Sequence, residues 1–113
     1  MTAIREHEDH MIKQTETALM GVRWTNERDG STLFFFPTPS PGARGIVEAG
    51  DNNIIFKRSL EYEVFVKHDG PCLKMIDQEK QEEFGYRIER LSKDLRLLTI
   101  VDKSGNQSNF RFL

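Results

Sequence analysis

Two stretches in the second half of the chain alternate apolar and polar residues with a period of two. The apolar residues are Leu60, Tyr62, Val64 and Val66 in the first stretch, and Phe84, Tyr86 and Ile88 in the second. A strand directs successive side chains to opposite faces, so this pattern predicts strands with one buried and one solvated face. Several such strands joined by turns predict a sheet that curls into a small antiparallel barrel or sandwich.

The rest of the chain after residue 21 divides into similar short segments separated by residues that favour turns. Asp29-Gly30 is a strong hairpin dipeptide, and Pro37, Pro39 and Pro41 cannot lie in a central strand. The expected strands are 22–27, 32–36, 45–49, 54–67, 72–76, 83–91, 95–102 and 108–112. Because 54–67 is too long for one regular strand, we expect a break near Arg58-Ser59. We therefore predict a mainly β fold, an antiparallel barrel of about eight strands over residues 22–113.

The first part of the chain, residues 2–20, has the pattern of one amphipathic α-helix. Thr2 is a suitable N-cap, and Gly21 suits the C-terminal stop. Apolar residues recur at helical spacing on one side, at Ile4, Met11, Ile12, Ala18 and Leu19. A helix with one apolar stripe must dock on an apolar surface, so we expect it to flank or plug the barrel within a single domain, 1–113.

Composition limits the classes of function. The chain has 113 residues, 37% of them hydrophobic, and a formal net charge of −2 with dispersed basic residues, which argues against nucleic-acid binding. Its single cysteine, Cys72, excludes an internal disulfide. No apolar run approaches the roughly 20 residues of a membrane span, so none is expected. The charged N-terminus lacks the apolar segment of a signal peptide, which predicts a cytoplasmic protein, or a periplasmic or secreted one if a leader was removed.

A few motifs connect this pattern to a known group of proteins. The segment Gly21-Val22-Arg23-Trp24 follows the helix and has one residue more than the Gly-x-Trp signature that opens the first strand of lipocalin-like (calycin) barrels. The stretch from Tyr86 to Leu97 is similar to the paired late strands of bacterial members. Over about residues 18–113 the chain resembles this lipocalin-like family. The resemblance implies that Arg111, on the last strand, packs across Trp24.

Candidate reactive residues are few, and each has a simpler interpretation. His7 and His10 are three residues apart without an evident third ligand, so a solvated helix face is favoured over a metal site. His68 and Cys72 flank a turn and would need a base and an electropositive setting to act as a catalytic pair. The block from Phe34 to Phe36 lacks the interleaved basic residues of a single-stranded nucleic-acid platform. We expect a protein that is not an enzyme and uses no cofactor or metal.

Two functions remain open on the sequence. The first is non-catalytic binding of a small, largely apolar ligand in the barrel interior, where tyrosine hydroxyls would orient it. Its lining is predicted to be Trp24, Phe34, Phe36, Tyr62, Val64, Tyr86 and Leu97, although Leu33 to Phe36 is apolar on both faces and leaves the parity of the Phe residues open. The second is a protein-binding module, an inhibitor or an assembly partner, that uses the rigid proline-rich loop 37–42.

Overall fold

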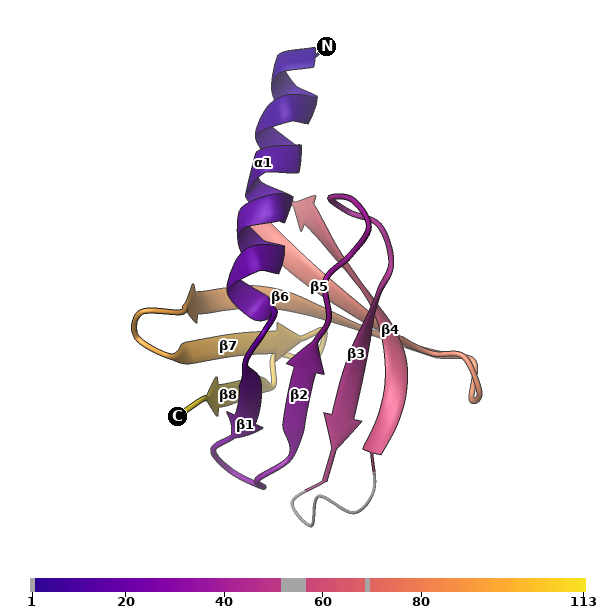
Figure 1. The fold of residues 1–113 in the computed structure, drawn as a ribbon, viewed down its shortest axis with the longest axis vertical. Coiled ribbons are helices and arrows are strands. Elements are labelled where there is room, and N and C mark those ends of the chain that lie inside the picture. Colours follow the sequence, from indigo (N-terminus) through magenta and orange to yellow (C-terminus); the bar gives the residue numbers. More distant parts are fainter. Residues whose placement is uncertain (1, 52–56, 69) are drawn as a thin grey trace.

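The computed structural model describes residues 2–51, 57–68 and 70–113, and within them the chain forms one helix followed by eight strands (Figure 1). The elements are α1 (Thr2–Leu19), β1 (Arg23–Asn26), β2 (Thr32–Phe35), β3 (Gly45–Gly50), β4 (Lys57–Lys67), β5 (Gly70–Asp77), β6 (Glu82–Ser92), β7 (Leu97–Asp102) and β8 (Gln107–Arg111). The predicted mainly β fold with an N-terminal helix is confirmed.

The strands form a closed barrel in which each strand pairs antiparallel with the next along the chain. The last strand, β8, completes the ring by pairing with β1, where Thr25 lies opposite Arg111 and Asn26 opposite Phe110. Closure matters because an open sheet leaves unpaired N–H and C=O groups along its edges, and a barrel has no such edges.

The core fills the inside of this barrel. In β4 the buried residues Leu60, Tyr62 and Val64 alternate with the partly exposed Glu61 and Glu63, as the period of two predicts. The same alternation around the ring directs one apolar side chain after another inward. The largest fully buried side chains are Trp24, Tyr62, Phe35, Leu19, Leu73, Leu98, Val47 and Val64.

Helix α1 closes one end of the barrel. Figure 1 shows its C-terminal half against the strands and its N-terminal half extending beyond them, and it contacts β4, β5 and β6. Ile12, Glu16 and Leu19 are buried at the spacing of one helix face. Gly21, with φ of 85°, reverses the chain after the helix, which is a conformation that favours glycine. A helix long and apolar enough to cross a membrane is not found in the part of the chain that the structure describes.

One predicted irregularity lies elsewhere. We expected a break near Arg58-Ser59, but β4 is continuous from Lys57, and Arg58 and Ser59 pair in register with Ala49 and Glu48 of β3. Residues 54–56 lie outside the described residues. The ladder to β3 holds this segment extended, so the break prediction is wrong. The register shift occurs instead in β6, between Ile88 and Arg90, where a bulge bends the strand.

Candidate functional site

The predicted lining residues divide between the inside and the outside of the barrel. Trp24, Tyr62 and Val64 are fully buried in the interior, whereas Tyr86 and Leu97 are partly buried. Phe34 and Phe36 were expected inside, but in β2 and just after it they alternate with the buried Leu33 and Phe35 and so face outward. The expectation is wrong for these two because every residue from Leu33 to Phe36 is apolar, and pairing with β1 and β3 decides which face is buried. It is also wrong for Leu97, which lies opposite the outward-facing Arg111, whereas its neighbour Leu98 is fully buried opposite Phe110.

The barrel interior is filled by large side chains. The ring of Phe112 meets Trp24 edge-on with centroids 5.0 Å apart, and Phe35 meets Tyr62 in the same way at 4.9 Å. The indole Nε1 of Trp24 donates a hydrogen bond of 2.8 Å to the carbonyl oxygen of Leu19 at the end of α1. An eight-stranded barrel is just wide enough for its side chains to fill, and this barrel follows that pattern.

The role implied for Arg111 is taken by other residues. Arg111 is 65% exposed and forms an ion pair with Glu27 on the barrel surface. The neighbouring Phe112 covers Trp24, and the Arg96 guanidinium lies 5.8 Å from the Phe112 ring centroid. The implied packing of Arg111 on Trp24 is therefore wrong, because odd-numbered residues of β8 face outward while Phe110 faces the core.

The hydroxyl of Tyr62 ties the proline-rich loop to the barrel wall. It donates a hydrogen bond of 2.5 Å to the backbone carbonyl of Phe36, the residue before the first proline. Burial raises the pKa of Tyr62 to about 12, and the negative charge of Glu16 acts in the same direction. The hydroxyl therefore stays protonated, and able to donate, throughout the physiological pH range.

A buried carboxylate on α1 holds the other end of the same loop. Glu16 is only 5% exposed, and its carboxylate accepts a hydrogen bond of 3.4 Å from the backbone N–H of Gly42. Burial raises the pKa of Glu16, while hydrogen bonds from Gly42 and from the Thr38 side chain act to lower it. Glu16 was missed from the sequence, although its position four residues after Ile12 and three before Leu19 places it on the buried helix face.

The space beneath the loop is tightly occupied at Gly45. A Cβ built on Gly45 would lie 2.7 Å from Cε1 of Tyr62 and 2.8 Å from Cγ2 of Thr38. The absence of a side chain therefore lets β3 approach the Tyr62 ring and the loop together. Gly45 was also missed, because a glycine at the start of a strand can indicate either a turn or close packing.

The loop and the strand residues beside it expose apolar side chains. Pro37, Pro39 and Pro41 are exposed, and beside them on the strands Phe36 is 40% and Ile46 45% exposed. Phe34 packs on Phe36 with ring centroids 5.0 Å apart. We call this set of six residues the proline-loop surface: Phe34, Phe36, Pro37, Pro39, Pro41 and Ile46. A concavity of about 230 Å³ separates the loop from Lys13, Thr17 and Met20 of α1.

The candidate reactive residues lie apart from this loop. His7 and His10 are exposed on the outer half of α1, and among the described residues no group of three or more His, Cys, Asp or Glu side chains is placed to hold a metal. His68 and Cys72 line one concavity on the outer side of the barrel. Burial raises the pKa of the Cys72 thiol, so it is less readily ionised than a free cysteine.

Replacing Glu16 with glutamine should make stability less dependent on pH. The pKa of Glu16 is higher in the folded state than in the unfolded chain, so the ionised carboxylate lowers the stability of the fold. This loss of stability disappears as the pH falls through the raised pKa toward the ordinary value of 4.5, because the carboxyl group becomes protonated. Glu16→Gln should therefore be more stable than the native chain at pH 7 and lose this advantage near pH 4.5. Urea unfolding of both proteins at pH 7 and at pH 4.5 measures this difference in stability.

Glu8→Gln is the matched control, because Glu8 is exposed on the same helix. A Glu16→Gln advantage that is equal at both pH values would show that burial of charge is not its cause.

In the part of the chain that the structure describes, the protein is a closed, eight-stranded antiparallel barrel with a helix across one end. In comparisons with known proteins, no protein-family model, no curated protein and no solved structure matches this chain. Its function is therefore inferred from its own residues.

Proposed function

We propose that this chain is a non-catalytic protein-binding module, an inhibitor or an assembly partner, that contacts its partner through the proline-loop surface. The observation that carries the proposal is a loop that is exposed at its tip and anchored at its base. Tyr62 binds the carbonyl that precedes the loop, and Glu16 binds the N–H of Gly42 at its end. A loop held in one conformation loses little entropy on binding, which favours affinity.

The chemistry of the surface suits a protein partner. Phe36 and Ile46 are neighbours across β2 and β3, where the Phe36 N–H donates a hydrogen bond of 2.9 Å to the Ile46 carbonyl. Contiguous exposed apolar residues often mark interaction sites. Arg44 borders them and pairs with Glu63 at 2.6 Å and Glu61 at 3.6 Å, which resembles the polar rim around an apolar interface centre.

The other function, binding of a small apolar ligand in the interior, stays a prediction. Its support is weaker because Trp24, Phe35 and Tyr62 occupy the volume that a ligand would need. The order of a short helix and an eight-stranded meander is that of lipocalin-like barrels, and we infer that the chain is related to them. Small barrels of that group are known to include protease inhibitors, and fold alone does not set function.

The test is affinity capture with paired variants, followed by quantitative mass spectrometry. A Phe36→Ser/Ile46→Ser double variant removes the apolar centre of the surface, while Leu95→Ser removes an apolar side chain that is 67% exposed and lies outside that surface. We expect at least one protein to be captured by the native chain and by Leu95→Ser, and to bind at least tenfold more weakly to the double variant. Circular dichroism verifies that both variants are folded.

A second variant tests the anchored loop. Tyr62→Phe keeps the buried ring but removes the hydrogen bond to Phe36. It should therefore lower the affinity for the same partner a few-fold while the barrel stays folded. If every captured protein binds the double variant as well as the native chain, the proline-loop surface is not an interface, and this proposal is wrong.

A further inference from the structure

A second concavity lies on the outer face of β4, β5, β6 and β7, and we call it the β5–β6 groove. Its volume is about 470 Å³, within the range of 300–1,000 Å³ typical of small-molecule sites. Its floor is a single row across the four strands, since register pairs Phe65 with Cys72, Cys72 with Arg87 and Arg87 with Val101. This floor is apolar at Phe65, Cys72 and Val101, and Arg87 lies in the same row between Cys72 and Val101.

Glycine hollows the groove beside this row. Gly85 is next to Tyr86 in β6, pairs with Lys74 of β5, and leaves an outward-facing strand position without a side chain. A Cβ built on Gly85 would lie 3.6 Å from Cε of Lys103, which is ordinary contact, so packing does not demand glycine here. Glycine in a strand interior often marks a close approach by a ligand or another backbone.

Positively charged side chains lie within and beside this floor. We call Lys67, Arg87 and Lys103 the cationic rim; all three line the groove and are exposed. Among the described residues that line the groove, Asp102 carries the one carboxylate. Three cations thus line the groove with one carboxylate among the described residues, on a chain whose formal net charge is −2.

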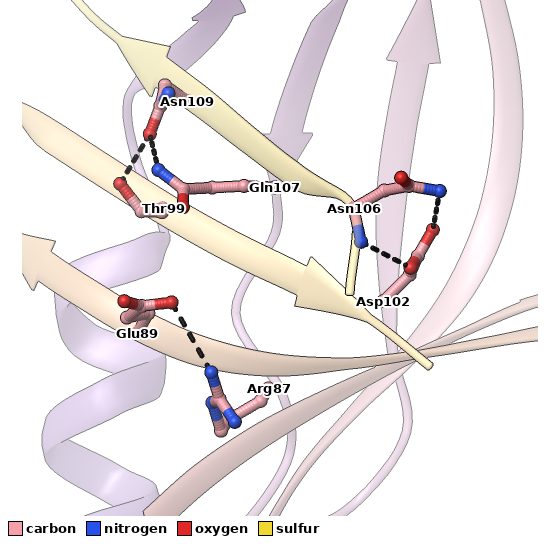
Figure 2. A network of polar contacts seen from close by, with 7 residues as sticks. All are labelled: Arg87, Glu89, Thr99, Asp102, Asn106, Gln107 and Asn109. Atoms are coloured by element: carbon pink, nitrogen blue, oxygen red, sulfur yellow. Dashed lines mark hydrogen bonds and ion pairs between the residues drawn. The ribbon is translucent and has the colours of Figure 1, made fainter. Parts of the chain in front are cut away.

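The carboxylates of Asp102 and Glu89 lie near the cationic rim. Figure 2 shows Asp102 turned toward Asn106, whose N–H donates to it at 2.9 Å, and Ser104 N–H donates to the same oxygen at 2.9 Å. These bonds lower the pKa of Asp102, so its carboxylate stays negatively charged, and they orient it toward the β7–β8 turn. Arg87 pairs with Glu89 at 3.4 Å, but its side chain is 64% exposed, and such surface pairs are weak.

The positive field reaches the floor. Lys67 and Arg87 both act to lower the pKa of Cys72, against the larger effect of burial. Cationic side chains and an apolar floor thus face the same space.

We propose that the β5–β6 groove binds a small, free organic anion with an apolar body. The cationic rim holds a carboxylate or phosphate head group through charge-assisted hydrogen bonds, and the apolar body covers the floor where Gly85 leaves room. This site is independent of the proline-loop surface, because its residues come from β4 to β7 and the β7–β8 turn.

The experiment titrates the full chain with probes that share one apolar body and differ in head group. Octanoate and octyl phosphate carry the required charge, octanol is neutral and octylamine is cationic, and inorganic phosphate has the charge without the body. Calorimetry gives the affinity, and amide chemical shifts give the location. We expect the two organic anions to bind at the groove at least tenfold more tightly than the other three probes.

Variants connect binding to the groove. Gly85→Val fills the hollow from a strand position that suits a β-branched residue, and it should abolish binding without unfolding the chain. Thr25→Val is its control, because exposed Thr25 lies in β1, three strands from β6 around the ring. Lys67→Gln and Lys103→Gln should each weaken binding about fivefold, whereas Lys80→Gln, in the β5–β6 turn, should not.

Five results would overturn the proposal. If octanol or octylamine bound as tightly as the organic anions, the cationic rim would not contribute to binding. If inorganic phosphate bound as tightly as the organic anions, the apolar floor would not contribute. Undiminished binding of the organic anions to Gly85→Val would show that they bind outside the groove. No binding of either organic anion at millimolar concentration would show that the groove is not an anion site. Binding only to vesicles of an anionic phospholipid, and not to the free probes, would identify a membrane surface instead.

Discussion

Replacing Trp24 with alanine should lower the free energy of unfolding by about 3–5 kcal/mol, the range for removing a large buried aromatic side chain. Trp24 is fully buried, packs edge-on with Phe112, and binds the Leu19 carbonyl through Nε1. The variant loses this packing and leaves a carbonyl at the end of α1 without its donor. Since small domains are stable by about 5–15 kcal/mol, much of the total would be lost.

Urea unfolding followed by circular dichroism measures this effect. Trp24→Phe separates the contribution of packing from that of the hydrogen bond, because it keeps most of the packing and removes the donor. It should therefore lower the free energy of unfolding by less than the alanine variant does. Leu95→Ala is the control, since Leu95 is 67% exposed and should change stability by less than about 0.5 kcal/mol. A Trp24→Ala variant as stable as Leu95→Ala would contradict the described core.

Replacing Gly45 with alanine should cost about 1–3 kcal/mol, although it adds only one methyl group. The new Cβ would lie 2.7 Å from the Tyr62 ring and 2.8 Å from Cγ2 of Thr38. The Tyr62 ring has little freedom to move, because Phe35 packs against it and its hydroxyl binds the Phe36 carbonyl. The strain therefore falls on the loop and on the start of β3.

Gly85→Ala is the matched control, because its Cβ would be 3.6 Å from the nearest atom, the flexible end of Lys103. That variant should be neutral or slightly stabilising, since alanine reduces the entropy of the unfolded chain. Adding Thr38→Ser to Gly45→Ala removes one of the two clashing atoms and should restore part of the lost stability. Equal unfolding midpoints for Gly45→Ala and Gly85→Ala would show that β3 can move away from Tyr62.

The fold was largely predictable because its information is local. The alternation of Leu60, Tyr62 and Val64 with glutamates needs no partner strand to be recognised, and turn dipeptides such as Asp29-Gly30 separate the segments. The helix prediction of 2–20 agrees with α1, Thr2–Leu19, for the same reason. Where the local pattern was ambiguous the prediction failed, as in the fully apolar run that contains Phe34 and Phe36.

The candidate sites were much less predictable, because their residues meet only in space. Glu16 and Gly42 are separated by 26 positions, and Tyr62 and Phe36 by the same number, so no spacing in the sequence connects them. The cationic rim is likewise drawn from β4, from β6 and from the turn after β7. Arg111 shows the reverse, since a role implied by resemblance was taken over by Phe112 once the strand register was known.

The sequence by itself determined the element types, their order and the antiparallel meander, because strand and helix periodicity follow from short-range backbone geometry. Only the tertiary structure decided that β8 pairs with β1, that aromatic side chains fill the interior, and that the apolar faces of Phe36 and Ile46 lie outside. Those outcomes depend on strand register and on competition for limited interior volume. Both are properties of the whole barrel that no single segment carries.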